Sequence, residues 1–176
     1  MGGRGSSSSM RSANLSNIES RIRGNPTETA ALIGPSGEVV FDKSDGLAGA
    51  VHFTEDECAR MANATLTHNH PRGTTFSPED IDLAVGRGLK EIRAVHSGGS
   101  YSLKRQYKIG DEVPSKYLRF SRDYDSAVGK YMKSTVDKVW ERTGDADKCN
   151  GMVADYRRQW LSKNSASYGW AYKEGN

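Results

Sequence analysis

The sequence predicts an α/β fold in which a mixed β-sheet is flanked by helices and followed by a C-terminal helical extension. Three observations lead to this prediction. Residues 28–41 and 91–104 contain short apolar or alternating runs around glycine-containing turns, as β-hairpins do. Helix-start signals occur at Thr54 and Ser77, each followed three residues later by an acidic residue. After residue 113, aromatic side chains recur at helical spacing.

Length and composition limit the class of protein. A chain of 176 residues fits one domain with an appendage, and 35% hydrophobic residues with a mean hydropathy of −0.71 indicate a small core. No apolar run approaches the ~20 residues that a membrane-spanning helix needs. The glycine- and serine-rich start lacks the apolar segment of a signal peptide. We therefore expect a cytoplasmic protein without a membrane span, and delivery as a toxin module stays open.

Residues 1–25 are predicted as a flexible tail, with a possible short helix from about Leu15. Residues 26–112 are predicted as the α/β domain, which begins with the hairpin of residues 28–41. In a capping box, Thr54 and Glu57 would satisfy each other's backbone N–H groups at the start of the next helix. The remaining elements expected in this domain are a helix at residues 55–63, a strand at 64–68, a helix at 78–89 and strands at 91–96 and 101–104.

Residues 113–176 are predicted as the helical extension. One amphipathic helix should run from about Ser115 to Arg142, because its aromatic and branched residues recur every three to four positions. A second helix around Trp160 should pack back on the first, and the aromatic face is expected to be core. Cys58 and Cys149 are too far apart in the sequence, and too few, for a zinc pattern. Cys58 lies in a predicted helix and is expected to be a buried thiol, while a disulfide between the two stays open.

The candidate site lies between the predicted strand and the helix that follows it. His68 and His70 are two residues apart, so on a strand their imidazoles point from the same face. Asp80 follows at the start of the next helix. Two imidazoles and one carboxylate leave a fourth position on a zinc ion for water, as catalytic zinc sites do. These residues therefore predict a metal-dependent hydrolase.

A structural interpretation of the same residues also exists. Ser77 is a suitable N-cap with Pro78 at the first helical position, and Asp80 can complete a capping box. The two histidines can also be polar residues on the wet face of a strand. The capping interpretation is compatible with metal binding, because a carboxylate held at a helix start is well oriented towards a nearby ion.

With these residues, the chain resembles the JAMM (MPN-plus) zinc metallopeptidases and their RadC-like bacterial and phage relatives. The family signature is an upstream glutamate, then His-x-His-Pro, then Ser-x-x-Asp, which matches His68 to Pro71 and Ser77 to Asp80. The loop after Pro71 holds five residues, one fewer than the usual pattern. The resemblance covers residues 26–105 and implies a JAMM-like (cytidine-deaminase-like) fold.

The resemblance implies a zinc ion held by His68, His70 and Asp80, and hydrolysis of a peptide or isopeptide bond in a protein or peptide substrate. Family members with isopeptidase activity act on ubiquitin-like conjugates, and phage- or toxin-associated modules of this kind occur. Glu28 would be the general base and Ser77 the oxyanion donor. Glu38 is the alternative to Glu28, since it also begins a predicted strand near the site.

Two other functions are possible. The net charge is +3, and basic residues recur among tyrosines after residue 104, which suits nucleic-acid backbones. Acidic residues are mixed with them, so a RadC-like, nucleic-acid-associated protein is not favoured. The second alternative is a non-catalytic JAMM-type scaffold, which the intact ligand set argues against. His96 is too far from the signature to be expected as a ligand.

Overall fold

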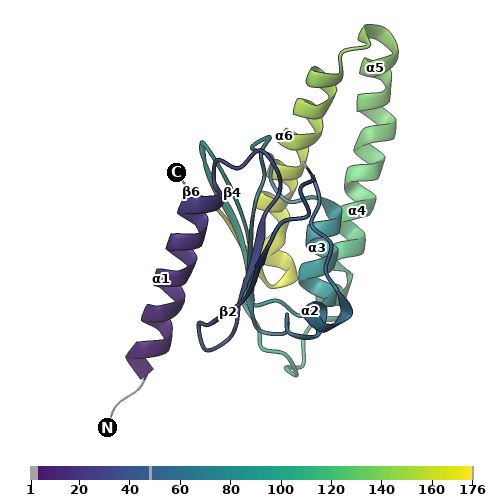
Figure 1. Ribbon diagram of the computed structural model, residues 1–176. Helices are drawn as coiled ribbons and strands as arrows, with labels where there is room; N and C mark the ends of the chain where they lie inside the picture. The colour runs from purple at the N-terminus through teal and green to yellow at the C-terminus, as the bar shows by residue number, and fades with distance from the viewer. Residues whose placement is uncertain (1–3, 48, 176) are drawn as a thin grey trace.

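A six-stranded mixed sheet forms the centre of the structure (Figure 1), a computed structural model that describes residues 4–47 and 49–175. The strands are ordered β2-β1-β3-β4-β5-β6. Their bounds are Ala30–Ile33 (β1), Val39–Lys43 (β2), Thr65–Asn69 (β3), Glu91–His96 (β4), Gly99–Arg105 (β5) and Trp170–Gly175 (β6). Only the β3–β4 pair among these strands is parallel, because a helix connects its two members. The mixed sheet expected from the sequence is confirmed.

Helices cover both faces of this sheet (Figure 1). The α-helices are Arg4–Ile22 (α1), Glu55–Ala59 (α2), Pro78–Gly86 (α3), Phe120–Tyr131 (α4), Asp137–Thr143 (α5) and Ala146–Asn164 (α6). The 3₁₀ turns are Ser115–Arg119 (η1) and Ser165–Tyr168 (η3), and a π-helical turn, η2, spans Met132–Val136. Helix α1 lies alone on one face, while α3, α4 and α6 lie on the other. The hairpin of α4, α5 and α6 reaches beyond the sheet.

Strand β1 contributes side chains to two hydrophobic cores, one on each face of the sheet. Its four residues are all buried, and they alternate between two cores. Ala30 and Leu32 belong to the large core beneath α3, α4 and α6, whereas Ala31 and Ile33 meet α1. A strand covered on both faces reads as a continuous apolar run, as Ala-Ala-Leu-Ile does here.

Helix α1 is fixed to the sheet by an ion pair. The Glu19 carboxylate accepts hydrogen bonds from the Arg93 guanidinium on β4 and from the Thr67 hydroxyl on β3, at 3.0 Å for Thr67. The helix starts at Arg4, well before the expected start near Leu15. No proline or glycine interrupts the chain between Ser6 and Arg23, so the backbone can continue as a helix. Residues 1–3 of the predicted tail lie outside the described residues.

The segment after residue 113 differs in two ways from the predicted extension. The first long helix is interrupted by the π-helical turn at Met132–Val136. The extension is also not wholly helical, because β6 pairs antiparallel with β5 and completes the sheet. The partner of β6 is some 70 residues earlier in the sequence, so local periodicity could not reveal the pairing. Phe120, Tyr124 and Trp170 belong to the same core as the sheet residues.

Three further expectations are met. The capping box of Thr54 and Glu57 is present at the start of α2, although this helix ends at Ala59, earlier than predicted. Cys58 and Cys149 are both free and buried. Within residues 4–47 and 49–175, no helix is long and apolar enough to cross a membrane.

We predict that Trp170→Ala lowers the free energy of unfolding by about 3–5 kcal/mol, because it leaves a cavity where β6 meets the core. Trp170 is 1% exposed. Trp140 on α5 is 51% exposed, so Trp140→Ala is the matched control and should change stability by at most about 0.5 kcal/mol. Urea denaturation of both variants measures the difference. Equal losses would show that the C-terminal strand does not share the core of the sheet.

Candidate metal centre

Strand β3 positions the two histidines. Leu66 and His68 face the core beneath α3, and Thr67 and Asn69 face α1, because side chains alternate along a strand. His70 follows the last strand residue but continues the pairing, since its backbone N–H donates to the Val95 carbonyl at 2.8 Å. The two imidazoles are buried, with 5% and 6% of each histidine exposed. They point in the same direction, as their spacing predicts.

Asp80 comes from the first turn of α3, held by the predicted capping box. The Ser77 backbone N–H donates to Asp80 Oδ2 at 2.7 Å, and the Ser77 hydroxyl accepts from the Asp80 backbone N–H at 3.2 Å. The short loop before this helix turns sharply at Gly73, whose φ of 69° suits glycine. The Gly73 N–H closes the turn on the His70 carbonyl at 2.9 Å. Five loop residues are therefore enough to bring Asp80 to the histidines.

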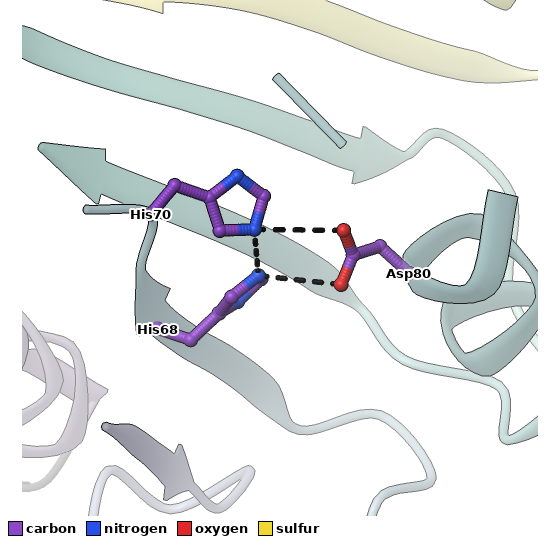
Figure 2. A group of neighbouring side chains, drawn as sticks. All are labelled: His68, His70 and Asp80. Atoms are coloured by element: carbon purple, nitrogen blue, oxygen red, sulfur yellow. Dashed lines mark hydrogen bonds and ion pairs between the residues drawn. The ribbon is translucent and has the colours of Figure 1, made fainter. Parts of the chain in front are cut away.

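The three side chains form a group that could hold a metal ion (Figure 2). The two Nε2 atoms are 2.7 Å apart. His68 Nε2 lies 3.3 Å from Asp80 Oδ1, and His70 Nε2 lies 3.6 Å from Asp80 Oδ2. Two ligand atoms on a tetrahedral zinc ion are separated by about 3.3 Å, given zinc–ligand distances near 2.0–2.1 Å. The measured separations bracket that value, so the donor set fits an ion of this size.

Hydrogen bonds behind the ligands decide which atoms face the centre. His70 Nδ1–H donates to the Thr74 carbonyl at 2.6 Å, so Nε2 of the neutral ring presents a lone pair. Asp80 Oδ2 already accepts from Ser77, which leaves Oδ1 as the better ligand atom. Nδ1 of His68 is buried without a hydrogen bond of good geometry, although the Arg93 backbone lies near it.

The electrostatics of the group suit metal binding. Burial, together with the charge of His68, lowers the pKa of His70 to about 4, so this ring is neutral at physiological pH. Burial raises the pKa of Asp80, but the charge and the hydrogen bond of His68, with the hydrogen bond from the Ser77 backbone, outweigh it and hold that pKa well below its usual range. Burial likewise opposes protonation of His68, but the carboxylates of Asp80 and Glu28 overcome it and raise its pKa.

Glu28 lies at the edge of this group, just before β1. Its Oε1 is 4.0 Å from His70 Nε2. Burial raises the pKa of Glu28, opposed by His68 and assisted by Asp80. Glu38 is exposed and its carboxylate lies against Gly34, away from the histidines. Of the two candidates for the upstream glutamate, the structure brings Glu28 to the site.

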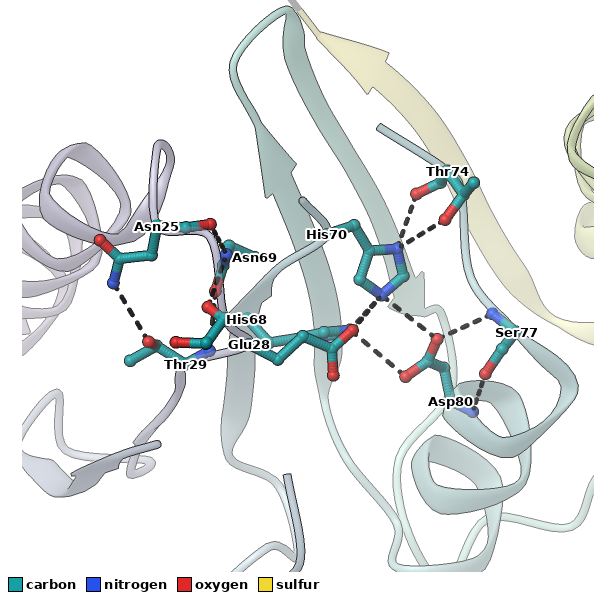
Figure 3. Close-up of polar contacts among 10 residues, drawn as sticks. Asn25, Glu28, Thr29, His68, Asn69, His70, Thr74, Ser77 and Asp80 are labelled. Carbon is teal, nitrogen blue, oxygen red and sulfur yellow. Dashed lines mark hydrogen bonds and ion pairs between the residues drawn. The ribbon is translucent and has the colours of Figure 1, made fainter. Parts of the chain in front are cut away.

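Asn69 ties the segment that carries Glu28 to the strand that carries the histidines (Figure 3). Its side chain points to the opposite face of β3 from His68 and His70. The amide oxygen accepts from the Thr29 N–H at 2.7 Å, and the amide nitrogen donates to the carbonyls of Asn25 and Thr27. The sequence shows Asn69 only as the middle residue of His-Asn-His. Its anchoring role could not be predicted, because its partners lie about 40 residues away.

A cavity of about 770 Å³ opens beside the group and includes Glu28, Ser77 and the three candidate ligands in its wall. The C-terminal hairpin also lines this cavity, through Met132 on η2 and Val153 and Arg157 on α6. These residues were missed from the sequence. A signal was present, since Arg157 lies four positions after Val153 and therefore on the inward face of an amphipathic helix.

His96 is not part of the group: its ring stacks on Tyr101, and its Nδ1 accepts from the Gly98 N–H at 3.1 Å. It lies on β4, within the sheet, and not on an edge strand.

No protein-family model matches the chain, and no curated protein and no solved structure matches it. The assignment of the site therefore rests on its own residues and their geometry.

We predict that the protein binds one divalent metal ion per chain and that His70→Ala abolishes stoichiometric binding. The alanine removes one of three protein ligands, and the two that remain bind a metal ion with lower affinity. His96→Ala is the matched control and should retain the metal. Elemental analysis of the purified variants measures this. Full metal content in His70→Ala would contradict the assigned ligand set.

Metal affinity should increase with pH across the neutral range. The pKa of His68 is raised above its ordinary value, which favours a proton on this ring that a metal ion must displace. His70 is already neutral above about pH 4 and adds no dependence in this range. One displaced proton gives a change of up to about tenfold in affinity per pH unit. Zinc titrations against a competing chelator measure the slope, and a flat profile would contradict the protonation of His68.

Proposed function

We propose that this protein is a zinc-dependent hydrolase of peptide or isopeptide bonds, of the JAMM (MPN-plus) type. The observation that carries the proposal is the convergence of His68, His70 and Asp80, with Glu28 beside them, at the wall of one cavity. Three protein ligands leave one position for a water molecule or substrate, as catalytic zinc sites require. A protein or peptide is the proposed substrate.

The choice of zinc follows from the donor types. Magnesium and calcium prefer oxygen ligands, whereas two imidazoles and one carboxylate suit zinc. The same donors also occur around iron(II) in oxygenases. Glu28 favours hydrolysis, because a carboxylate near the ligands but outside the set can accept a proton from an attacking water. Zinc supplies a lowered pKa of bound water, near 7, and polarises a substrate carbonyl.

Glu28 is proposed as the general base. Its carboxylate is near the ligand set, and burial raises its pKa towards the range in which a base can both accept and return a proton. The network of Asn69 holds the neighbouring Thr29 backbone and so restricts where Glu28 can move. Glu28 would thus take the proton of water and deliver it to the leaving amine.

Ser77 is proposed as the donor to the oxyanion of the tetrahedral intermediate. Its oxygen accepts from the Asp80 N–H, which leaves the hydroxyl hydrogen to donate into the cavity. One such donor typically contributes ~2.7–4 kcal/mol to the stabilisation of the transition state. The capping role and the catalytic role use different lone pairs and hydrogens of the same hydroxyl, so they are compatible.

Two alternatives retain less support. A metal-free scaffold has no need of two buried histidines beside a carboxylate, with the tautomer of His70 fixed by the Thr74 carbonyl. A nucleic-acid-associated role would use the basic residues after residue 104. None of those from Lys104 to Lys133 is among the described residues that line the cavity. A nucleic acid bound by them alone would not occupy the candidate site.

We predict that Glu28→Gln keeps the metal and lowers hydrolysis by roughly 100-fold or more, because glutamine has the same size but accepts no proton. Glu38→Gln is the matched control and should have nearly native activity. Mass spectrometry can compare the cleavage of a library of peptides and isopeptide-linked peptides by the zinc-loaded variants. The metal content of each variant is measured in parallel. Loss of zinc in Glu28→Gln would make Glu28 a ligand. If Glu38→Gln were inactive while Glu28→Gln stayed active, the general base would be Glu38 and the assignment of Glu28 would be wrong.

A further inference from the structure

Part of the cavity wall is built by the C-terminal hairpin. Met132 lies on the π-helical turn, and Val153, Ala154 and Arg157 follow one face of α6. π-helical turns often occur at functional sites, because the extra residue changes which side chains face inward. The hairpin therefore supplies a surface that a substrate bound at the ligands can contact.

Arg157 is the unusual residue of this wall. It is half-buried, and its Nε atom is shielded from solvent without a hydrogen-bond partner. Within the described part of the chain it has no ion-pair partner either, whereas Arg93, which is also partly buried, binds Glu19 and Glu91. An N–H group of a guanidinium that is shielded from water without a hydrogen-bond partner lowers stability. Its retention on an inward helix face points to a partner that the chain itself does not provide.

Tyr124, which lies near Arg157, does not fill that role. The Tyr124 hydroxyl is close enough for the charge of Arg157 to affect its pKa, yet it donates to the Phe76 carbonyl at 2.7 Å. A phenol is also neutral, because burial raises the pKa of Tyr124 far above its usual value. Arg157 therefore lies near Tyr124, which is hydrogen-bonded to the loop that leads into Ser77.

We infer that Arg157 is a specificity-determining residue that binds a carboxylate of the substrate. The inference rests on the proposed function, since it assumes that the scissile bond is held at His68, His70 and Asp80. A planar guanidinium can bind a carboxylate through two parallel hydrogen bonds. Glu28 and Glu79 also line the cavity, so a singly charged carboxylate fits better than a doubly charged phosphate. The substrate is therefore acidic near the bond that is cleaved.

The test uses hydroxamates, which coordinate zinc at one end. A series of alkyl monohydroxamates of increasing length ends either in a carboxylate or in the corresponding carboxamide. Calorimetric titration of the zinc-loaded protein should show a preference of about tenfold or more for the carboxylate at the length that spans the cavity. Arg157→Gln should remove the preference without changing the affinity for the carboxamide, and Arg157→Lys should keep part of it.

Arg158→Gln is the matched control. Arg158 is the next residue on α6, but it pairs with Asp155 and Glu174 on the surface. The same change of charge there should leave the carboxylate preference intact. Equal losses in Arg157→Gln and Arg158→Gln, or a preference that survives Arg157→Gln, would overturn the inference.

A second measurement separates this inference from the proposed function. The Nε–H signal of Arg157, assigned by its loss in Arg157→Lys, should shift in NMR spectra when the carboxylate probe is added, and not with the carboxamide. A shift in the metal-free protein, without any hydroxamate binding to the zinc-loaded protein, would support Arg157 and contradict the zinc site. Hydroxamate binding without a shift would support the zinc site and overturn the role of Arg157.

The source of the carboxylate can be identified with two peptide hydroxamates. One has a free C-terminal carboxylate and a glutamine side chain, and the other has a C-terminal amide and a glutamate side chain. Tighter binding of the first, lost in Arg157→Gln, indicates recognition of a chain terminus. Tighter binding of the second indicates recognition of an acidic side chain, and no difference from doubly amidated peptide would contradict the inference.

Discussion

The hydrogen bonds between Ser77 and Asp80 are the interaction on which the candidate site depends. They satisfy backbone N–H groups at the start of α3, and a capping side chain of this kind typically contributes about 0.5–2 kcal/mol to helix stability. They also orient the Asp80 carboxylate, with Oδ2 held by the Ser77 N–H and Oδ1 directed to His68. Stability and ligand geometry are therefore coupled: the helix cannot begin elsewhere without moving the carboxylate from the histidines.

The two faces of β3 have different roles at this site: one carries the candidate ligands and the other anchors the strand. One face presents His68 and then His70 to the cavity, and the other presents Thr67 and Asn69 to the side of α1. Asn69 binds the segment that leads into β1, and Thr67 binds Glu19 of α1. The face away from the cavity thus fixes the backbone from which the ligands project. Little freedom remains for the histidines, because their strand is buried and hydrogen-bonded on both sides.

The sequence revealed those parts of the structure that depend on neighbours in the chain. His68, His70 and Asp80 could be found because a two-residue spacing and a capping box are local signals. The parts that depend on distant residues could not be found in this way. Strand β6 pairs with a segment far back in the sequence, and the place of Arg157 in the cavity depends on how α6 packs. The length of α1 was missed because its polar residues carry no strong periodicity, and its contact with Arg93 is long-range.

The central claim is that His68, His70 and Asp80 bind one zinc ion and leave one position open. X-ray absorption at the zinc edge of the zinc-loaded protein tests it most directly, because nitrogen and oxygen ligands differ from sulfur in distance and scattering. The account predicts nitrogen and oxygen neighbours alone, at about 2.0–2.1 Å, with the multiple scattering of two imidazole rings. A sulfur neighbour at about 2.3 Å would place the metal on Cys58 or Cys149 and contradict the account, as would the signal of a single imidazole.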